Sequence, residues 1–286
     1  MRSRATKENN YFALFSEGKT LRFAIDPSKP ITPLIHPEIE DVSLGTKCFA
    51  GCPYCYTSAI SSGVLYTDVV EKIKKSYGSL PEDQRPFQIA IGGGGEPTLH
   101  PEFVEVLKAV AELGVLPNYT TNGMHLTEEI LEVTKEFCGG VAVSCHPHLE
   151  KIWREALRKF TSKGIKTCLH IIVGEPGSSE KFWEIYDSTD DIYCYVCLPY
   201  QAVGRAKKIE TEKEWDVFFS EAIDRKVEDI AVGAPFFEYL QKHQEIVDQM
   251  GIGIYEPEMF SGYRKLDENF ETVLISSYNP TPKGTQ

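Results

Sequence analysis

From about residue 42 onward, short apolar runs alternate with longer segments whose apolar residues recur at helical spacing. The short runs are rich in β-branched or aromatic residues and end at glycine, proline or polar residues, as buried strands do. Six strands are therefore predicted, at Val42–Gly45, Phe87–Ile91, Leu116–Thr120, Gly140–Ser144, Lys166–Val173 and Ile192–Leu198. The helices between them are predicted at Tyr66–Tyr77, Pro101–Leu113, Thr127–Phe137, Leu149–Lys163 and Ser179–Tyr186. Strands that alternate with helices form parallel sheets with right-handed crossovers, so the pattern predicts an α/β fold, either a barrel or an open doubly wound sheet.

The two flanks of this alternation follow other patterns. Tyr11–Glu17 and Leu21–Asp26 are alternating apolar segments on either side of a turn at Gly18, which predicts a β-hairpin. The proline-rich stretch Pro27–Pro37 predicts an irregular connector. Beyond the sixth strand, the patterns predict a helix at Thr211–Ala222 and a seventh strand at Val227–Gly233. They then predict a small terminal β addition, formed by Gly251–Tyr255 and Glu271–Tyr278, and a frayed tail at Pro280–Gln286.

Charge and hydropathy exclude some function classes. The formal net charge of −12 argues against a protein that grips nucleic-acid phosphates, which needs a basic surface. Arg205, Lys207 and Lys208 are interpreted as a solvated loop, with a local basic patch as the alternative. No apolar run reaches the length of about 18 residues that a membrane helix needs, and the N-terminus lacks the apolar core of a secretory signal. We therefore expect a cytoplasmic protein without a membrane partner.

A cysteine-rich loop follows the first strand of the alternation. Cys48, Cys52 and Cys55 are separated by three and then two residues, close enough for their thiolates to reach one metal centre. Gly51 suits backbone angles with positive φ in such a loop. Three ligands are one fewer than the four thiolates that saturate an ordinary [4Fe–4S] cluster, so one iron would keep an open position. The alternative is a zinc site completed by a distant cysteine or histidine.

A glycine-rich loop follows the second strand. Gly92–Gly95 lead directly into Glu96 and Pro97, so backbone groups are open to a ligand and a carboxylate stands beside them. Such a loop suits a small zwitterion with an ammonium group. Neither a P-loop nor a dinucleotide fingerprint is present. A tight turn from strand to helix explains the glycines equally well.

Together the two loops resemble the radical S-adenosylmethionine superfamily, with Cys-x3-Cys-x2-Cys after the first strand and Gly-Gly-Glu-Pro after the second. Thr120–Gly123, Val143–Ser144 and Leu198–Ala206 are similar to segments at the ends of later strands in that family. The resemblance implies a partial (β/α)6 TIM-like barrel with an N-terminal β-hairpin and a small C-terminal α/β extension. It divides one folded unit into residues 1–41, a barrel core over 42–206, and residues 207–286.

The resemblance also implies the cofactors and the residues that hold them. Cys48, Cys52 and Cys55 would bind three irons of a [4Fe–4S] cluster, and S-adenosylmethionine would chelate the fourth. The residues implied to contact S-adenosylmethionine are Gly94, Gly95 and Glu96 at the methionine ammonium, Tyr54 through its backbone at the adenine, Asn122 in the turn after the third strand, and Ser144 and Arg154 at the ribose or carboxylate. For the last two, a polar strand end and a solvated helix arginine are equally good interpretations.

Five further cysteines are interpreted as buried thiols: Cys138, Cys145, Cys168, Cys194 and Cys197. Cys194 and Cys197 lie three apart in a predicted strand, so their side chains point to opposite faces. Many relatives carry a cysteine-rich C-terminal extension for auxiliary clusters, but no cysteine follows Cys197. Cys145 is a hypothetical hydrogen-atom donor, as in some peptide-modifying relatives. Cys145 to His148 are alternatively a metal half-site, or simply loop residues.

Three functions are consistent with these observations. The first is reductive cleavage of S-adenosylmethionine to a 5′-deoxyadenosyl radical that abstracts hydrogen from a peptide or protein residue, with a reductant such as flavodoxin or ferredoxin. The second is a glycyl-radical-enzyme activase. The third is a zinc-binding or redox-sensing module without catalysis. The substrate pocket is expected among residues after the sixth strand, such as Pro235–Tyr239 and Tyr255–Tyr263.

Overall fold

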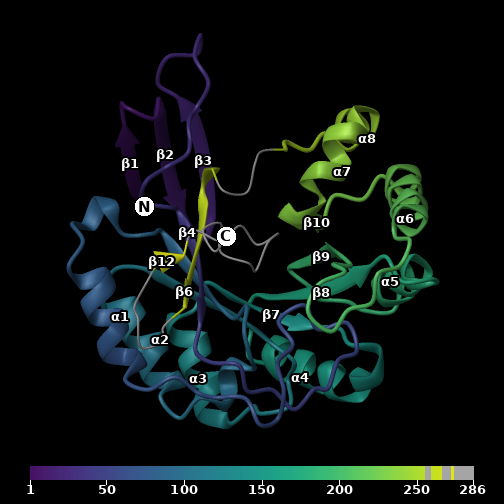
Figure 1. Ribbon diagram of the computed structural model, residues 1–286, viewed down its shortest axis with the longest axis horizontal. Helices are drawn as coiled ribbons and strands as arrows, with labels where there is room; N and C mark the ends of the chain where they lie inside the picture. Colours follow the sequence, from purple (N-terminus) through teal and green to yellow (C-terminus); the bar gives the residue numbers. More distant parts are fainter. Residues whose placement is uncertain (255–258, 266–271, 274–286) are drawn as a thin grey trace.

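The computed structural model describes residues 1–254, 259–265 and 272–273 of the 286-residue chain. They form a three-stranded antiparallel sheet, in the order β1-β2-β3, and a nine-stranded sheet in the order β10-β9-β8-β7-β6-β5-β4-β11-β12. Figure 1 shows the larger sheet curled, with helices on its outer side and the N-terminal sheet at one edge. The chain therefore adopts the expected partial barrel.

Six consecutive parallel strands form the middle of the large sheet: β4 (Ile39–Ser43), β5 (Gln88–Ile91), β6 (Leu116–Thr121), β7 (Gly140–Ser144), β8 (Thr167–Val173) and β9 (Cys194–Pro199). All six were predicted, and the bounds of β7 agree completely. The first begins three residues earlier than predicted, at Ile39. The predicted seventh strand is present as β10 (Ile230–Val232), parallel to β9 and shorter than expected.

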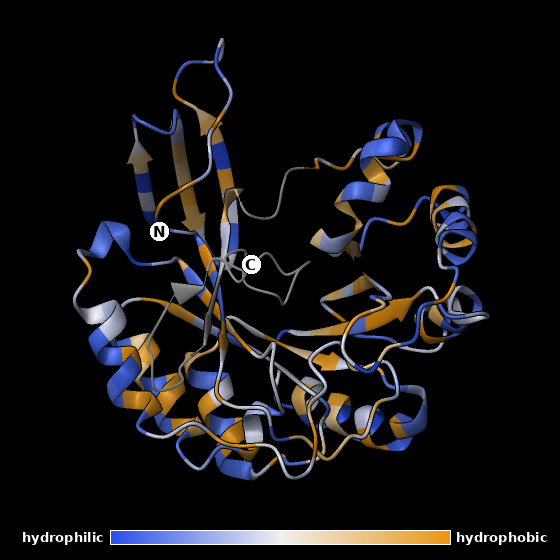
Figure 2. Cartoon of the chain, in the orientation of Figure 1, coloured by the Kyte–Doolittle hydropathy of each residue, from blue (hydrophilic) through white to orange (hydrophobic). Residues whose placement is uncertain are grey.

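Six helices cover the outer side of this sheet: α1 (Val69–Gly78), α2 (Phe103–Glu112), α3 (Glu128–Phe137), α4 (Glu150–Ser162), α5 (Ser178–Asp187) and α6 (Glu212–Arg225). Helix α1 begins later than predicted because Asp68 before it adopts a left-handed conformation. Helix α3 begins where predicted, since the Thr127 side chain accepts a hydrogen bond from the Ile130 amide. Apolar and polar residues alternate around these helices (Figure 2), so each presents an apolar face to the sheet.

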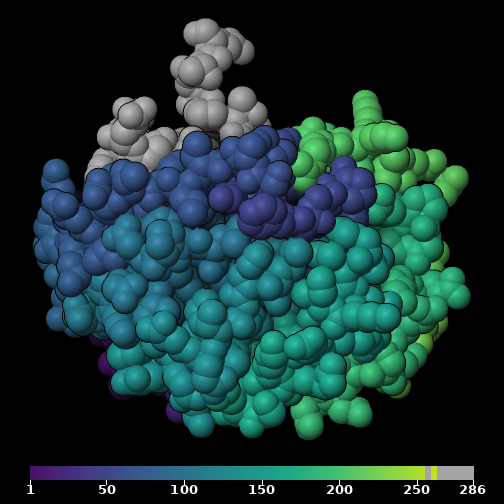
Figure 3. Space-filling view, turned by 90° about the horizontal axis from the view of Figure 1, so that it is seen from below, coloured from purple at the N-terminus to yellow at the C-terminus, as the bar shows by residue number. Residues whose placement is uncertain are grey.

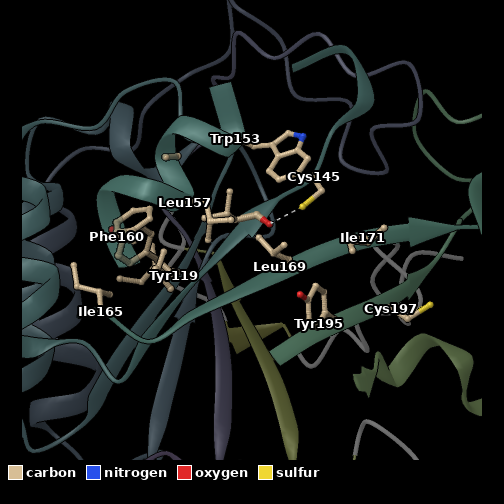
Figure 4. Packing of buried hydrophobic residues seen from close by; sticks show 14 of the residues in the cluster. Tyr119, Cys145, Trp153, Leu157, Phe160, Ile165, Leu169, Ile171, Tyr195 and Cys197 are labelled. Atoms are coloured by element: carbon tan, nitrogen blue, oxygen red, sulfur yellow. Dashed lines mark hydrogen bonds between the residues drawn. The ribbon is translucent and has the colours of Figure 1, made fainter. Parts of the chain in front are cut away.

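Strand alternation separates a core face from an inner face. On β8, Leu169, Ile171 and Val173 are buried in the main core, whereas Cys168, His170 and Ile172 are less buried and face the inside of the curl. Figure 4 shows Leu169 beside Leu157 and near Cys145, in the layer beneath α4. Burial of these apolar side chains stabilises the helix layer. The inner face is left for polar residues and for the cavity described below.

The N-terminal sheet contains the predicted hairpin, β2 (Tyr11–Ser16) with β3 (Lys19–Ala24). An unpredicted strand, β1 (Arg2–Thr6), pairs with β2. Most of its residues are polar, and its two arginines lie over the Phe87 ring and donate to distant backbone carbonyls. Arg2 donates to the carbonyl of Gly114 at 2.8 Å, and Arg4 donates to that of His36 at 2.7 Å. A polar strand held by such long-range contacts has no apolar alternation to reveal it.

The C-terminal part differs most from the prediction. Two short helices, α7 (Phe237–Lys242) and α8 (Gln244–Met250), precede residues 251–254, which are irregular, so the strand predicted from Gly251 is wrong over those residues. Helix α8 ends at Gly251, which has a φ of +64°. Strand β11 (Ser261–Lys265) was not predicted and pairs in parallel with β4. Strand β12 (Thr272–Val273) falls within the predicted Glu271–Tyr278 segment. Tyr255, the rest of that segment and the predicted frayed tail lie outside the described residues.

Four short 3-10 helices complete the described secondary structure, at Glu82–Gln84, Pro97–Leu99, Pro147–Leu149 and Ala234–Phe236. In Figure 3 the teal middle of the chain forms a broad face of the molecule, with the violet-to-blue segments that precede it in sequence along one edge. Within the part of the chain that the structure describes, no helix is long and apolar enough to cross a membrane.

Candidate radical SAM site

A cavity of about 350 Å³ lies at the carboxyl ends of the central strands. All three cysteines of the predicted cluster loop line it. So do most other predicted site residues, namely Tyr54, Gly94, Gly95, Glu96, Asn122 and Ser144. Arg154 does not line it: its guanidinium pairs with Glu150 at 2.9 Å and lies 4.4 Å from the Trp153 ring. The fold therefore brings together residues from four strand ends, and leaves Arg154 on α4 outside.

The cysteine loop is held in shape by backbone hydrogen bonds. The Cys48 amide donates to the Ile60 carbonyl at 2.9 Å, and the Thr46 amide donates to that of Val64 at 2.8 Å. Gly51 has a φ of +65°, the left-handed conformation expected of a glycine here. The loop is thus folded back on itself, with its three thiols around the cavity.

The glycine loop packs directly against the cysteine loop. The Gly95 amide donates to the Gly45 carbonyl at 2.7 Å, and the Glu96 amide donates to that of Lys47 at 2.8 Å. A Cβ on Gly95 would lie 2.2 Å from the Lys47 carbonyl oxygen, and one on Gly94 would lie 2.3 Å from that of Gly45. These two glycines are therefore needed for the close contact of the loops, whatever the cavity binds.

Glu96 is a buried brace between the glycine loop and the turn after β6. One carboxylate oxygen accepts three hydrogen bonds: from the Thr98 amide, from the Thr98 hydroxyl at 2.7 Å and from the Thr121 hydroxyl at 2.7 Å. The other oxygen accepts from the Asn122 amide at 2.8 Å. Burial raises the pKa of Glu96, and the four donors act in the opposite direction. Since a carboxylate has about four acceptor positions, this one is used largely within the protein.

Asn122 connects that turn to a cluster ligand. Its side-chain amide donates to Sγ of Cys48 at 3.6 Å, while its Oδ1 accepts from the Met124 amide at 2.9 Å. Outer hydrogen bonds of this kind orient metal ligands and tune a bound centre. Asn122 also lines the cavity, and its predicted contact with S-adenosylmethionine stays a prediction.

Arg205 clamps the cysteine loop from the segment after β9. Its guanidinium donates to the carbonyls of Cys52 at 3.2 Å and Ala59 at 2.7 Å, and its backbone amide donates to that of Cys55 at 3.0 Å. The interpretation of this residue as part of a solvated loop is wrong, although Lys207 and Lys208 are exposed as expected. No local pattern in the sequence could have indicated bonds that span about 150 residues.

The three thiols of the cysteine loop line one cavity, and three thiolates are the ligand number that leaves one iron of a [4Fe–4S] cluster open. Among the residues that the structure describes, no three histidine, cysteine, aspartate or glutamate side chains converge on a position for one metal ion. Burial, and then the neighbouring Cys55 and Cys48, raise the pKa of Cys52 to about 12. Metal binding needs the thiolate, so a cationic centre would bind here with release of protons.

The loop after β7 packs its histidines on the cysteine loop. The Tyr54 hydroxyl and Nδ1 of His146 are 3.1 Å apart, and Nε2 of His148 is 2.9 Å from the Ala50 carbonyl oxygen. Burial, followed by the neighbouring His148, lowers the pKa of His146 to about 4. Both histidines therefore contact residues of the cysteine loop. Cys145 is buried, lines the cavity and donates to the Val143 carbonyl at 3.8 Å (Figure 4); its role as a hydrogen-atom donor stays a prediction.

The remaining cysteines lie away from the cluster loop. Cys194 and Cys197 are on opposite faces of β9, as predicted: Cys197 is fully buried in the helix-side core, and Cys194 is partly buried on the other face. Cys194 lies beside Cys168 in the register of β9 with β8, and their thiols are hydrogen-bonded. Both therefore have protein partners.

The pocket expected after the sixth strand is only partly present. Pro235 lines the cavity, but Tyr239 is buried against Trp215, with ring centroids 5.3 Å apart. Phe260 packs against Tyr11 in the core of the N-terminal sheet, and residues 255–258 lie outside the described part. Cavity residues that the sequence did not indicate include Asp41, Thr57 and His170.

Comparison with known proteins decides the family. The model of the Radical SAM superfamily matches residues 42–189, which is just over half of the chain. The chain belongs to the radical SAM superfamily. This family uses a [4Fe–4S] cluster with S-adenosylmethionine, and the cavity supplies three thiols and a glycine loop suited to them. The expected resemblance is thus confirmed, and with it the enzyme class of the domain.

Individual relatives match shorter stretches. The chain is 29% identical over 89 residues to 7,8-dihydro-6-hydroxymethylpterin dimethyltransferase of Methanocaldococcus jannaschii, covering 31% of this chain and 18% of that protein. It is 30% identical over 97 residues to the tungsten-containing aldehyde ferredoxin oxidoreductase cofactor-modifying protein of Pyrococcus furiosus, covering 33% of this chain and 26% of that one. The matches span about a quarter or less of these curated relatives.

Solved structures show the same fold at low identity. SuiB of Streptococcus suis bound to S-adenosylmethionine has a TM-score of 0.65 and 15% identity, with 82% of this chain and 59% of SuiB covered. SuiB bound to its precursor peptide SuiA also gives 0.65, at 13% identity, with 87% and 66% covered. The structure of anSMEcpe with AdoMet and the Cp18Cys peptide gives 0.55 and 16% identity, with 72% and 67% covered. These likenesses support the fold.

Proposed function

We propose that this radical SAM protein modifies a residue of a peptide or protein. The observation that carries the chemistry is the junction of the two loops around one cavity, where Cys48, Cys52 and Cys55 face the glycine loop. The peptide-bound states of SuiB and anSMEcpe, which share the fold, support a peptide substrate. The acidic net charge of −12 argues against nucleic acid.

The cofactors are assigned to residues as follows. Cys48, Cys52 and Cys55 would hold a [4Fe–4S] cluster and leave one iron for S-adenosylmethionine. The backbone of Gly94 and Gly95 would receive the methionine ammonium. We assign Glu96 mainly to holding that loop in position, because its carboxylate already accepts four hydrogen bonds.

The other half of S-adenosylmethionine is assigned to Tyr54 and Ser144, which line the same cavity. The Tyr54 backbone would meet the adenine, and Ser144 at the end of β7 would meet the ribose or carboxylate. Arg154 is given no contact, since it is paired outside the cavity. The chain's own part in the reaction is to orient the cofactors and to exclude water from the radical.

The reaction needs one electron from outside the chain. A cluster with S-adenosylmethionine bound beside it would supply 5′-deoxyadenosyl radical chemistry, which removes a hydrogen atom from the substrate. The electron would come from a low-potential reductant such as flavodoxin or ferredoxin. The cofactors supply this chemistry once bound.

Anaerobic purification and one assay test the proposal. We expect a brown protein with about four irons per chain that releases 5′-deoxyadenosine when dithionite and S-adenosylmethionine are added. The matched variants are Cys52→Ala in the cluster loop and Cys138→Ala, which removes a partly buried thiol after α3. Only the first should lose iron and activity. A colourless protein with one zinc per chain would contradict the proposal.

A further inference from the structure

Asp41 lies on the inner face of β4 and lines the cavity. Its strand neighbours Glu40 and Val42 are buried on the opposite face, and Glu40 accepts a hydrogen bond from the hydroxyl of Tyr77 on α1. In the register with β5, Asp41 is beside Ala90, which lines the same cavity. The small Ala90 side chain does not cover the Asp41 carboxylate from the β5 side.

This carboxylate has no hydrogen bond or ion pair with any residue that the structure describes. It differs in this respect from Glu96, the other carboxylate in the described cavity wall, which accepts four hydrogen bonds. Burial, and then the neighbouring Glu40, raise the pKa of Asp41 to about 6. At neutral pH it is therefore mostly ionised, in a place where an unpaired charge is costly.

The described cavity wall offers no cation to pair with it. No lysine or arginine is among the lining residues of the described part. Its two histidines, His146 and His170, are neutral at pH 7 because burial lowers the pKa of each to about 4. The described wall of the cavity thus carries a negative charge without a cationic partner in that wall, and a positively charged ligand would neutralise it.

We propose that Asp41 binds a cationic group of the substrate, an ammonium or a guanidinium, such as a lysine or arginine side chain of a peptide. This assignment rests on the proposed function. The depth of Asp41 favours the substrate over the cofactor. Ser43, on the same face, approaches Gly94 of the glycine loop, and Asp41 lies two residues earlier, which places it about 7 Å further into the barrel.

The experiment uses the cluster-loaded enzyme with saturating S-adenosylmethionine. The probes are N-acetyl-lysine amide and N-acetyl-arginine amide, with N-acetyl-norleucine amide as the neutral analogue of lysine. Their dissociation constants are measured by calorimetry for the wild type and for Asp41→Asn, Asp41→Glu and Glu105→Gln. Glu105 is exposed on α2 and loses the same charge outside the cavity.

We expect the wild type to bind a cationic probe and not the norleucine amide. Asp41→Asn should weaken that binding by about tenfold or more, Asp41→Glu should restore part of it, and Glu105→Gln should leave it unchanged. Equal binding by the wild type and Asp41→Asn would overturn the assignment. So would a tenfold loss of affinity for S-adenosylmethionine in Asp41→Asn, since it would place the carboxylate in the cofactor site.

The proposed function is tested separately by wild-type release of 5′-deoxyadenosine. If release fails while the cationic probe still binds through Asp41, the proposed function is overturned and the cation site remains. If release occurs and the probe does not bind, the cation site alone is overturned. The thermal midpoint of each variant shows that it is folded.

Discussion

The side-chain amide of Asn122 donates a hydrogen bond to Sγ of Cys48, over 3.6 Å, from the turn that follows β6. The same residue donates its backbone amide to Glu96 and accepts from the Met124 amide. One side chain therefore joins the cysteine loop to the turn, and its backbone joins the turn to the glycine loop. Hydrogen bonds to cluster sulfur stabilise the reduced, more negative state and raise the reduction potential.

Asn122→Asp should lower the reduction potential of the cluster. The carboxylate keeps the shape and the acceptor for Met124, but it removes the N–H donor and adds negative charge near Cys48. With a fixed reductant, release of 5′-deoxyadenosine should slow by about tenfold or more. A redox titration followed by electron paramagnetic resonance measures the potential.

The matched control is Asn118→Asp on β6, the strand that precedes this turn, where the side-chain amide donates to Oε1 of Gln88 at 3.0 Å instead of to a thiol. It should leave the potential unchanged. An Asn122→Asp enzyme with a full iron content and the wild-type potential would show that the contact does not tune the cluster.

Gly95→Ala should disconnect the two loops of the site. The added Cβ would lie 2.2 Å from the Lys47 carbonyl oxygen and 2.6 Å from the Lys47 amide nitrogen, so the backbone of one loop has to move. We expect iron content to fall well below that of the wild type and the thermal midpoint to drop by several degrees, as for a loss of about 1 to 3 kcal/mol.

Gly92→Ala is the control within the same loop. Its Cβ would meet only the Cβ of Thr120, at an ordinary 3.7 Å, and its φ is not in the left-handed region. This variant should keep its iron and its thermal midpoint. Equal iron contents in the two variants would mean that the close contact at Gly95 is dispensable.

Arg205→Gln should loosen the cysteine loop. Two guanidinium hydrogen bonds, to the carbonyls of Cys52 and Ala59, are lost, and charged hydrogen bonds of this kind contribute about 1.5 to 3 kcal/mol each. We expect faster loss of iron to a chelator, measured by the decay of the cluster absorbance. Lys207→Gln removes an exposed charge two residues away and should behave as the wild type. Similar decay rates for both variants would show that the Arg205 hydrogen bonds do not stabilise the cysteine loop.

Short-range patterns predicted most of the barrel. The alternation of apolar runs with helical segments located six strands, because each strand buries one face under the helices whichever strand lies beside it. Leu169 and Ile171 on β8 are examples of such buried residues. The cysteine and glycine loops could also be predicted, since Cys48 to Cys55 and Gly94 to Glu96 are each contiguous in sequence. The two loops are expected to touch because they follow β4 and β5, which are adjacent parallel strands.

Contacts between distant segments were not predictable in this way. Arg2 and Arg4 hold β1 through distant carbonyls, so a polar segment forms a strand. Arg205 reaches the cysteine loop from about 150 residues away. Asp41 was included in no predicted strand, and only the register of β4 with β5 shows that it faces the cavity.

The stability of the protein should depend on pH through Asp41. Its pKa rises from 3.8 to about 6 on folding, chiefly through burial, so the folded state holds this proton more tightly than the unfolded state does. The free energy of unfolding therefore falls as pH increases between about 4 and 6, and the loss is complete above that range. Asp41→Asn removes the ionisable group and therefore this pH-dependent loss of unfolding free energy. The variant should match the wild type at the acid end of the range and exceed it above pH 7 by on the order of 1 to 2 kcal/mol, since cavity water screens part of the cost.

Urea unfolding at pH 5, 6, 7 and 8 measures this difference in the protein without cluster. Asp224→Asn, at an exposed position on α6, makes the same chemical change where no burial acts and should follow the wild-type profile. The gap between Asp41→Asn and the wild type should widen from pH 5 to pH 7 and then stay constant. If the free energies of unfolding of Asp41→Asn and the wild type instead run parallel across this pH range, the pKa of Asp41 is not shifted by folding. In that case there is no electrostatic cost for a cationic substrate group to relieve.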